Sequence, residues 1–196
     1  MALHQTAALL LDTSPGTGFD GPKLLAPYGR STLVEHVVSQ ALEWPVAAVV
    51  VVLGPDGEAV AEAVELTPAI VVIDSEWAEG SAAPLRVGLD LLLRIGGFDG
   101  ALVAHADQPN IAPDVVAAVV ERGMRKPMTV ARYRYAHGAP YLVAAEIWQR
   151  LMGIEGDADL DQLLVTHSNW MDEVWVTQLA PRRVESPLDL AEVAPH

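Results

Sequence analysis

The sequence of 196 residues contains no cysteine, few basic residues and no long hydrophobic run. Without cysteine there is no disulfide, no thiolate metal site and no thiol nucleophile. A membrane-spanning helix needs about 20 consecutive apolar residues, whereas an apolar run such as 46–53 (VAAVVVVL) is the length of a strand. The amino terminus lacks the basic region of a signal peptide. We therefore expect a cytoplasmic protein.

Basic residues are scarce relative to acidic ones. The chain has 12 lysine and arginine residues against 26 aspartate and glutamate residues, which gives a formal net charge of −14. So acidic a surface repels nucleic-acid phosphates and anionic lipid headgroups. We expect a small-molecule ligand, with neither nucleic acid nor a membrane as partner, and either a monomer or a small homo-oligomer. Taken alone, the acidic balance favours a simple solubility role.

Apolar runs of strand length alternate with helical patterns along the chain. The runs cover 6–12, 46–53, 69–73, 100–106, 128–133 and 173–179, and helical patterns cover 31–44, 83–97 and 113–123. Continuous apolar character indicates strands that are buried on both faces of a largely parallel sheet. This length supports one sizeable core. We predict a single domain over 1–196 with an α/β fold, a three-layer α/β/α sandwich around a Rossmann-like, mostly parallel sheet.

Ligands of such sheets bind beyond the carboxyl ends of the strands. The first loop at this edge is DTSPGTGFDGPK (12–23), which combines glycines and hydroxyl side chains with a terminal Lys23. Backbone N–H groups of such a turn, together with a lysine, favour phosphate. The spacing fits neither the GxxxxGK[ST] loop nor the GxGxxG fingerprint. An ordinary mobile loop rich in turn-forming residues is the alternative interpretation.

Two further segments fall at the same edge. Asp107 follows the run 100–106, and a strand-end carboxylate is the kind of oxygen ligand that magnesium prefers; the alternative is a turn cap before Pro109. The segment DSEWAEGSAAPLRVGL (74–89) places small residues before a helix whose first turn contains Arg86. A helix amino terminus attracts anions, although a plain helix start with a solvent-facing arginine has the same pattern.

The carboxyl-terminal third contains two weaker candidates. HGAP (137–140) is typical of a turn, and His137 is either a substrate contact or an ordinary exposed histidine. Asp157 is expected to cap a helix over 158–165.

In their order along the chain, these segments resemble the MobA-like nucleotidyltransferase family, in particular its molybdenum cofactor cytidylyltransferase-like branch. That family opens with LAAGxSxRxGxxKLLxPxxGxxLLxH, and LLLDTSPGTGFDGPKLLAPYGRSTLVEH stands in its place. VVVVLGPD, DSEWAEGSAAPLRVGL, ADQP, HGAPYLV, GDADLDQLL and ESPLDL follow in the order of the family's segments. The resemblance covers nearly the whole chain and implies the fold of the nucleotide-diphospho-sugar transferases.

The resemblance also implies an activity, the magnesium-dependent transfer of CMP or GMP from an NTP to a small phosphorylated acceptor such as a molybdopterin-type cofactor. CTP is favoured over GTP because the DQP form leans toward the cytidylyl branch. The implied residues are Lys23 and Asp107 for catalysis; Leu11, Ser14, Gly16, Gly18, Lys23, Gly80, Arg86 and Gly88 for the nucleotide; His137, Gly138 and Pro140 for the acceptor; and Asp107, with Asp157 or Glu185 as second carboxylate, for Mg²⁺.

The opening loop departs from the family pattern. With Lys23 aligned, the family's AAG is Asp12-Thr13-Ser14, its arginine is Gly18 and its next glycine is Asp20. An arginine binds phosphate through a bidentate fork that lysine does not reproduce. The alternative function is therefore a catalytically silent paralogue that binds a nucleotide, a cofactor or a partner protein. An oxidoreductase that binds a nicotinamide nucleotide in the same pocket fits the fold, but no motif supports it.

Overall fold

The computed structural model describes residues 5–80, 82–134, 136–153 and 168–195. Within this part, seven strands form one sheet in the order β5-β4-β1-β6-β8-β7-β9. Their bounds are β1 (Thr6–Leu11), β4 (Ala48–Leu53), β5 (Ile70–Ile73), β6 (Gly100–His105), β7 (Met128–Arg132), β8 (His137–Ala144) and β9 (Met171–Trp175). Only β8 runs antiparallel to its neighbours. The predicted mostly parallel sheet is confirmed.

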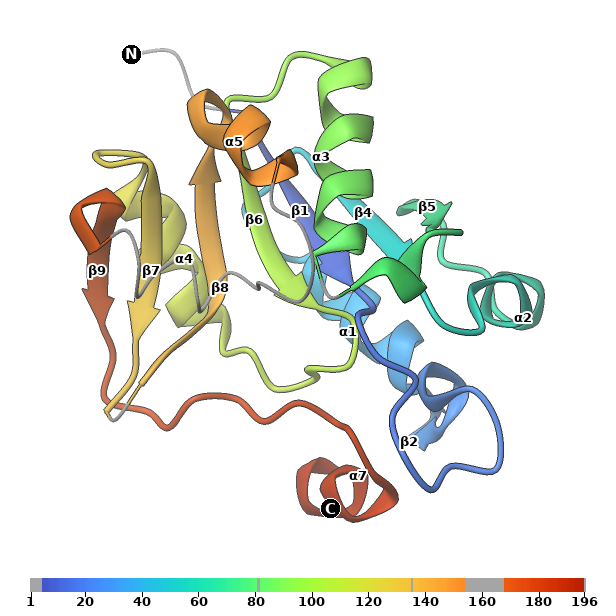
Figure 1. Ribbon diagram of the computed structural model, residues 1–196. Coiled ribbons are helices and arrows are strands. Elements are labelled where there is room, and N and C mark those ends of the chain that lie inside the picture. Colours follow the sequence, from blue (N-terminus) through green and yellow to red (C-terminus); the bar gives the residue numbers. More distant parts are fainter. Residues whose placement is uncertain (1–4, 81, 135, 154–167, 196) are drawn as a thin grey trace.

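Helices cover both faces of this sheet. They are α1 (Leu33–Leu42), α2 (Gly57–Ala63), α3 (Ala83–Ile95), α4 (Pro113–Arg122), α5 (Trp148–Met152) and α7 (Pro187–Val193). Figure 1 shows α3 and α5 over one face and α1 and α4 over the other, which is the predicted three-layer sandwich. Because both faces are covered, every residue of β1 is buried. The absence of polar alternation in the strand sequences follows from this double cover.

Local sequence signals place the helix ends. Thr32 and Glu35 form a capping box at the start of α1, since each side chain accepts a hydrogen bond from the backbone N–H of the other. Pro113 opens α4 and Gly96 ends α3 with a φ of 76°. A small hairpin of β2 (Pro27–Tyr28) and β3 (Ser31–Thr32) precedes α1.

The turn predicted at 137–140 is wrong, because these residues open strand β8. Gly138 pairs with Ala131 and Tyr141 pairs with Val130, so two extra residues lie between consecutive pairs. This bulge accommodates Pro140, which has no N–H to donate to a ladder. The strand expected at 173–179 is displaced and is β9 (Met171–Trp175). Asp157 and the helix expected at 158–165 lie outside the described residues.

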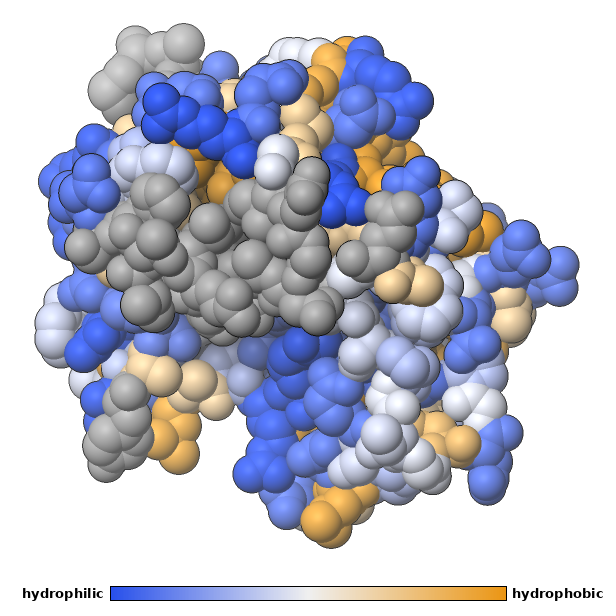
Figure 2. Space-filling view, in the orientation of Figure 1, coloured by the Kyte–Doolittle hydropathy of each residue, from blue (hydrophilic) through white to orange (hydrophobic). Residues whose placement is uncertain are grey.

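The coloured part of the visible surface is mainly hydrophilic. Figure 2 shows hydrophilic residues over much of this face, with apolar residues in separate patches. Among the described residues, no helix has both the length and the apolar character needed to cross a bilayer.

The chain after β9 returns across the carboxyl edge of the sheet before it ends in α7 (Figure 1). The N–H of Val184 donates to the carbonyl of Asp107 at 2.9 Å, and the N–H of Thr17 donates to the carbonyl of Glu185 at 2.8 Å. The carboxyl-terminal segment is thereby tied to two strand-end loops, and these three segments form the site.

Candidate functional site

Two aspartates stand at the ends of neighbouring parallel strands. Leu11, the last residue of β1, is paired with His105, the last residue of β6, so Asp12 and Asp107 leave the sheet at the same edge. Both are buried, with exposed fractions of 2% and 0%. Charged side chains are rarely this buried without a partner.

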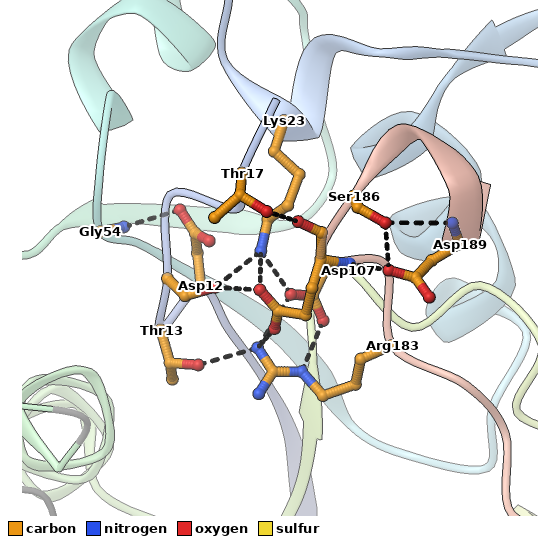
Figure 3. Close-up of polar contacts among 11 residues, drawn as sticks. Asp12, Thr13, Thr17, Lys23, Gly54, Asp107, Arg183, Ser186 and Asp189 are labelled. Atoms are coloured by element: carbon orange, nitrogen blue, oxygen red, sulfur yellow. Dashed lines mark hydrogen bonds and ion pairs between the residues drawn. The ribbon is translucent and has the colours of Figure 1, made fainter. Parts of the chain in front are cut away.

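Lys23 supplies one cation to this edge. It begins the 3₁₀ turn η1 (Lys23–Leu25) and is 2% exposed. Its Nζ donates to Oδ2 of Asp107 at 2.6 Å and to Oγ of Ser14 at 3.1 Å, and it lies 3.7 Å from Oε2 of Glu185. The loop that contains Lys23 therefore folds back onto the strand-end carboxylate, as Figure 3 shows.

Arg183 supplies a second cation, from the carboxyl-terminal segment (Figure 3). Its Nε donates to Oδ1 of Asp107 at 2.9 Å and its Nη2 donates to Oδ2 at 2.8 Å, which is the bidentate fork geometry. Nη2 also contacts Oγ1 of Thr13 at 2.9 Å and Oε1 of Glu185 at 3.0 Å. Arg183 thus joins the end of β6 to the opening loop.

The loop packs closely around these charges. The Oγ of Ser14 donates to Oε2 of Glu185. Gly16 has a φ of 71°, and a Cβ added there would lie 2.8 Å from the Cδ of Lys23 and 3.1 Å from the carbonyl oxygen of Glu185. Only glycine therefore permits this approach of the loop to the buried lysine. Gly18 also has a positive φ and is exposed.

Burial and charge separate the pKa values of the two aspartates. Burial alone would raise the pKa of Asp107, but the hydrogen bonds and charge of Arg183, together with the charge of Lys23, lower it to about 2. Burial raises the pKa of Asp12 to about 7, partly offset by Lys23 and reinforced by the charge of Asp107. Asp12 accepts one hydrogen bond from the N–H of Gly54, while its Oδ1 has no partner among the described residues. Asp107 is consequently ionised at neutral pH, whereas Asp12 is protonated in part of the molecules at that pH.

The shift at Asp12 predicts a stability that depends on pH. The folded-state pKa lies above the unfolded value of 3.8, so the folded state binds the proton more tightly and loses stability as pH rises from about 4 to about 7. Asp12→Asn removes this loss. We expect the free energy of unfolding of Asp12→Asn, minus that of wild type, to increase by about 2–3 kcal/mol as the pH is raised from about 5 to about 8. Urea unfolding at each pH measures this difference. Asp20→Asn, at an exposed loop position, is the control, and a pH-independent difference for Asp12→Asn would refute the assignment.

The site is closed in this conformation. The pocket between the loop and the β4–α2 connection, lined in part by Asp12, Ser14, Lys23 and Pro55, leaves no volume that a water molecule can enter. An open hollow of about 360 Å³ lies on the outer side of the loop, between Gly18 and α7. A triphosphate would therefore reach Lys23 only after the loop moves outward.

A divalent metal does not fit this arrangement. Within the described part of the chain, no group of three or more His, Cys, Asp or Glu side chains is placed to hold a metal. Asp107, the carboxylate that the resemblance assigns to magnesium, has one oxygen bonded to Arg183 and the other bonded to both Arg183 and Lys23. Glu185, the candidate second ligand, is engaged by Ser14 and Arg183.

Three more residues that the resemblance assigns to the nucleotide lie just before α3 or within it. Gly80 precedes α3 with a φ of 132°, and Arg86 lies in the first turns of α3. Gly88 is buried where α3 meets the sheet, since an added Cβ would lie 3.1 Å from Leu9 and 3.2 Å from Val52. This close approach explains Gly88 by packing, and the proposed roles of Gly80 and Arg86 in nucleotide binding stay predictions.

The acceptor-side residues lie on β8, toward the far edge of the sheet. His137 Nε2 is 2.6 Å from Oε1 of Glu173 and 3.3 Å from Nη1 of Arg132. Gly138 and Pro140 flank the bulge described above. These contacts hold His137 at the carboxyl edge of β7 and β9, and its role toward an acceptor stays a prediction.

Sequence reasoning missed Arg183 and treated Asp12 only as a departure from the family. Asp12 carried the same signal as Asp107, because it directly follows a buried strand. Arg183 stands 76 residues from its partner Asp107, so no local pattern connects them. Its place two residues before Glu185, where a segment with family resemblance begins, was the one indication in the sequence.

A mostly parallel sheet with a glycine-rich loop, a buried lysine and strand-end carboxylates at its carboxyl edge is an arrangement typical of nucleotide-binding α/β proteins. Within this class the chain belongs to one family, since the profile of the MobA-like NTP transferase domain matches residues 10–170.

The individual relatives match this chain over shorter stretches than the family profile does. Nicotine blue oxidoreductase of Paenarthrobacter nicotinovorans is 32% identical over 100 residues, which are 51% of this chain and 48% of that protein. Bifunctional protein GlmU of Rhodospirillum rubrum is 32% identical over 122 residues, which are 61% of this chain and 26% of that protein. The chain thus spans about half or about a quarter of the length of these curated relatives.

Solved structures support the fold. The crystal structure of Rv0371c from Mycobacterium tuberculosis matches with a TM-score of 0.85 at 24% identity, covering 96% of this chain and 97% of that one. A manganese complex of the same protein matches with a TM-score of 0.84 at 23% identity, covering 97% and 98% of the two chains. At these identities the likeness concerns the fold, and the predicted fold of the nucleotide-diphospho-sugar transferase type is confirmed.

Proposed function

We propose that this chain is a nucleotidyltransferase that moves a nucleoside monophosphate from an NTP to a small phosphorylated acceptor. The observation that carries the proposal is Lys23, which is buried against Asp107 at the ligand edge of a MobA-like domain. A buried lysine beside a glycine-rich loop is a site for phosphate charge.

The proposed reaction is the one that the family resemblance implies. An anionic oxygen of the acceptor attacks the α-phosphorus of the NTP, a new P–O bond forms, and the bond to pyrophosphate breaks. The chain has no need of a covalent nucleophile, since positioning and neutralisation of the phosphate charge lower the barrier. In this proposal Lys23 contacts the phosphates once the loop has moved outward, and the N–H groups of the loop orient them.

The finer assignments are also part of the proposal. CTP is favoured over GTP because of the DQP sequence at residues 107–109, and a molybdopterin-type phosphate is the acceptor suggested by the resemblance. Magnesium commonly accompanies an NTP and supplies charge neutralisation at the phosphates. For Asp107 to hold it, the Arg183 fork would have to leave that carboxylate first.

The second candidate is a silent paralogue that binds a nucleotide, a cofactor or a partner protein without transfer. Two observations favour it, the occupied oxygens of Asp107 and the closed pocket around Lys23. The relative named nicotine blue oxidoreductase makes a nicotinamide nucleotide one ligand to include in the test.

The test is ligand stabilisation followed by turnover. Unfolding is followed with CTP, GTP, ATP and NAD, each with and without Mg²⁺, because a ligand at 100 times its Kd stabilises a protein by about 2.7 kcal/mol. We expect stabilisation by CTP or GTP, and pyrophosphate release when a phosphorylated acceptor is added. NTP binding without pyrophosphate release would favour the silent paralogue. If none of the three NTPs stabilises the protein, the transferase proposal fails.

A further inference from the structure

Arg183 holds Asp107 in the way a metal ion would. The guanidinium bonds to both oxygens of Asp107, at 2.9 and 2.8 Å, and reaches Oε1 of Glu185 at 3.0 Å. The resemblance assigns a divalent cation to Asp107, with Glu185 or Asp157 as the second carboxylate. Oδ2 of Asp107 already accepts from both Lys23 and Arg183, and a metal on this carboxylate would repel the guanidinium, so we expect the two cations to compete for Asp107.

Arg183 also lies against the opening loop. Its Nη2 donates to Oγ1 of Thr13 at 2.9 Å, and the backbone bond from Thr17 to Glu185 keeps the two segments together. The loop itself has Gly18 where the family pattern has an arginine. The tertiary fold thus brings an arginine to a loop whose own sequence lacks one.

Part of the Arg183 guanidinium is accessible to a ligand. The Arg183 side chain is 30% exposed, whereas the side chain of Lys23 is 1% exposed. Nη1 of Arg183 has no hydrogen-bond partner among the described residues, and Figure 3 shows this nitrogen turned away from Asp107. A phosphate oxygen can bond there, or take over the fork once Arg183 releases Asp107.

We propose that Arg183 is the phosphate-binding arginine of this site, supplied from the carboxyl-terminal segment, and that in the empty protein it occupies the place of a divalent cation on Asp107. This inference rests on the proposed function for its phosphate ligand. It predicts that removing the guanidinium strengthens metal binding and weakens nucleotide binding. A merely structural role would change both affinities in the same direction or neither.

The experiment compares wild type with Arg183→Gln. Mn²⁺ alone is titrated and followed by electron paramagnetic resonance, and CTP and GTP are titrated separately in EDTA by calorimetry. For Arg183→Gln we expect the Mn²⁺ Kd to fall at least about tenfold, because the competing cation is gone, and the nucleotide Kd to rise at least about tenfold. Arg182→Gln is the matched control, since Arg182 has the same charge but pairs with Asp189 and Glu192 on the outer side.

The outcomes separate the two proposals. An unchanged Mn²⁺ Kd, or an unchanged nucleotide Kd, in Arg183→Gln would overturn the role of Arg183 while leaving the transferase proposal intact. Absence of NTP binding by wild type, with Mg²⁺ or without it, would instead remove the proposed function. Circular dichroism confirms that each variant is folded. Arg183→Lys, which keeps the charge without the fork, is expected to restore nucleotide binding only in part.

Discussion

Replacing Lys23 with methionine is expected to raise the nucleotide Kd at least about tenfold and to lower the free energy of unfolding by roughly 3–5 kcal/mol. Methionine keeps the length of the side chain and removes the charge. The buried carboxylate of Asp107 loses a partner at 2.6 Å, and Ser14 loses its hydrogen-bond donor. The variant therefore leaves charge uncompensated in a site that excludes water.

Lys126 provides the control for this variant, because it is the other lysine in the sequence and its side chain is exposed. Lys126→Met makes the same chemical change without a buried partner, and we expect changes within about 0.5 kcal/mol. Binding is measured by calorimetry and stability by urea unfolding. A Lys23→Met variant with the Kd of wild type would show that the loop is not a phosphate site.

Replacing Asp107 with asparagine is expected to reduce nucleotidyl transfer at least about 100-fold. Both cations of the site depend on this carboxylate, since Lys23 and Arg183 each bond to it at less than 3 Å. Neutralising it leaves two positive charges with Glu185 and Asp12 as the remaining anions. We expect the free energy of unfolding to fall by roughly 3–5 kcal/mol at neutral pH.

The pH dependence of this variant has a defined sign. Because the pKa of Asp107 is held at about 2, below the ordinary 3.8, its ionisation stabilises the folded state above about pH 4. That contribution, about 2 kcal/mol, is lost as pH falls toward about 2. Asp107→Asn should lack this acid-dependent loss, whereas Asp90→Asn, at an exposed pair with Arg94, should retain it. Equal acid sensitivity of Asp107→Asn and wild type would contradict the burial of an ionised carboxylate.

Much of the fold could be predicted from the sequence. Continuous apolar runs gave the strands because both faces of the sheet are covered, and Thr32, Glu35 and Pro113 marked helix starts through local hydrogen bonding and backbone restriction. The turn expected at 137–140 failed for a tertiary reason. A glycine and a proline there fit a bulged strand, because β7 pairs with β8 on either side of the bulge.

The candidate site was likewise predicted from the sequence only in part. Strand-end position located Asp107 at the expected ligand edge, and the loop after the first strand brought Lys23 to the same edge, where the two side chains bond to each other. The role of Asp12 in the charge cluster depends on depth of burial, which raises its pKa to about 7 and which no sequence window reports. Whether a strand-end carboxylate is buried or solvated is decided by the segments that cover it.

By itself the sequence determined the sheet, its helical cover and the edge at which a ligand is expected, because these depend on local periodicity and on the ends of strands. The partners of the charges were decided by the tertiary structure. Arg183 reaches Asp107 only because the chain after β9 crosses the carboxyl edge and is held there by backbone bonds from Val184 and Thr17. Contacts between residues so far apart in the chain arise from packing. Through packing, Arg183 contacts Thr13 in a loop whose own twelve residues contain no arginine.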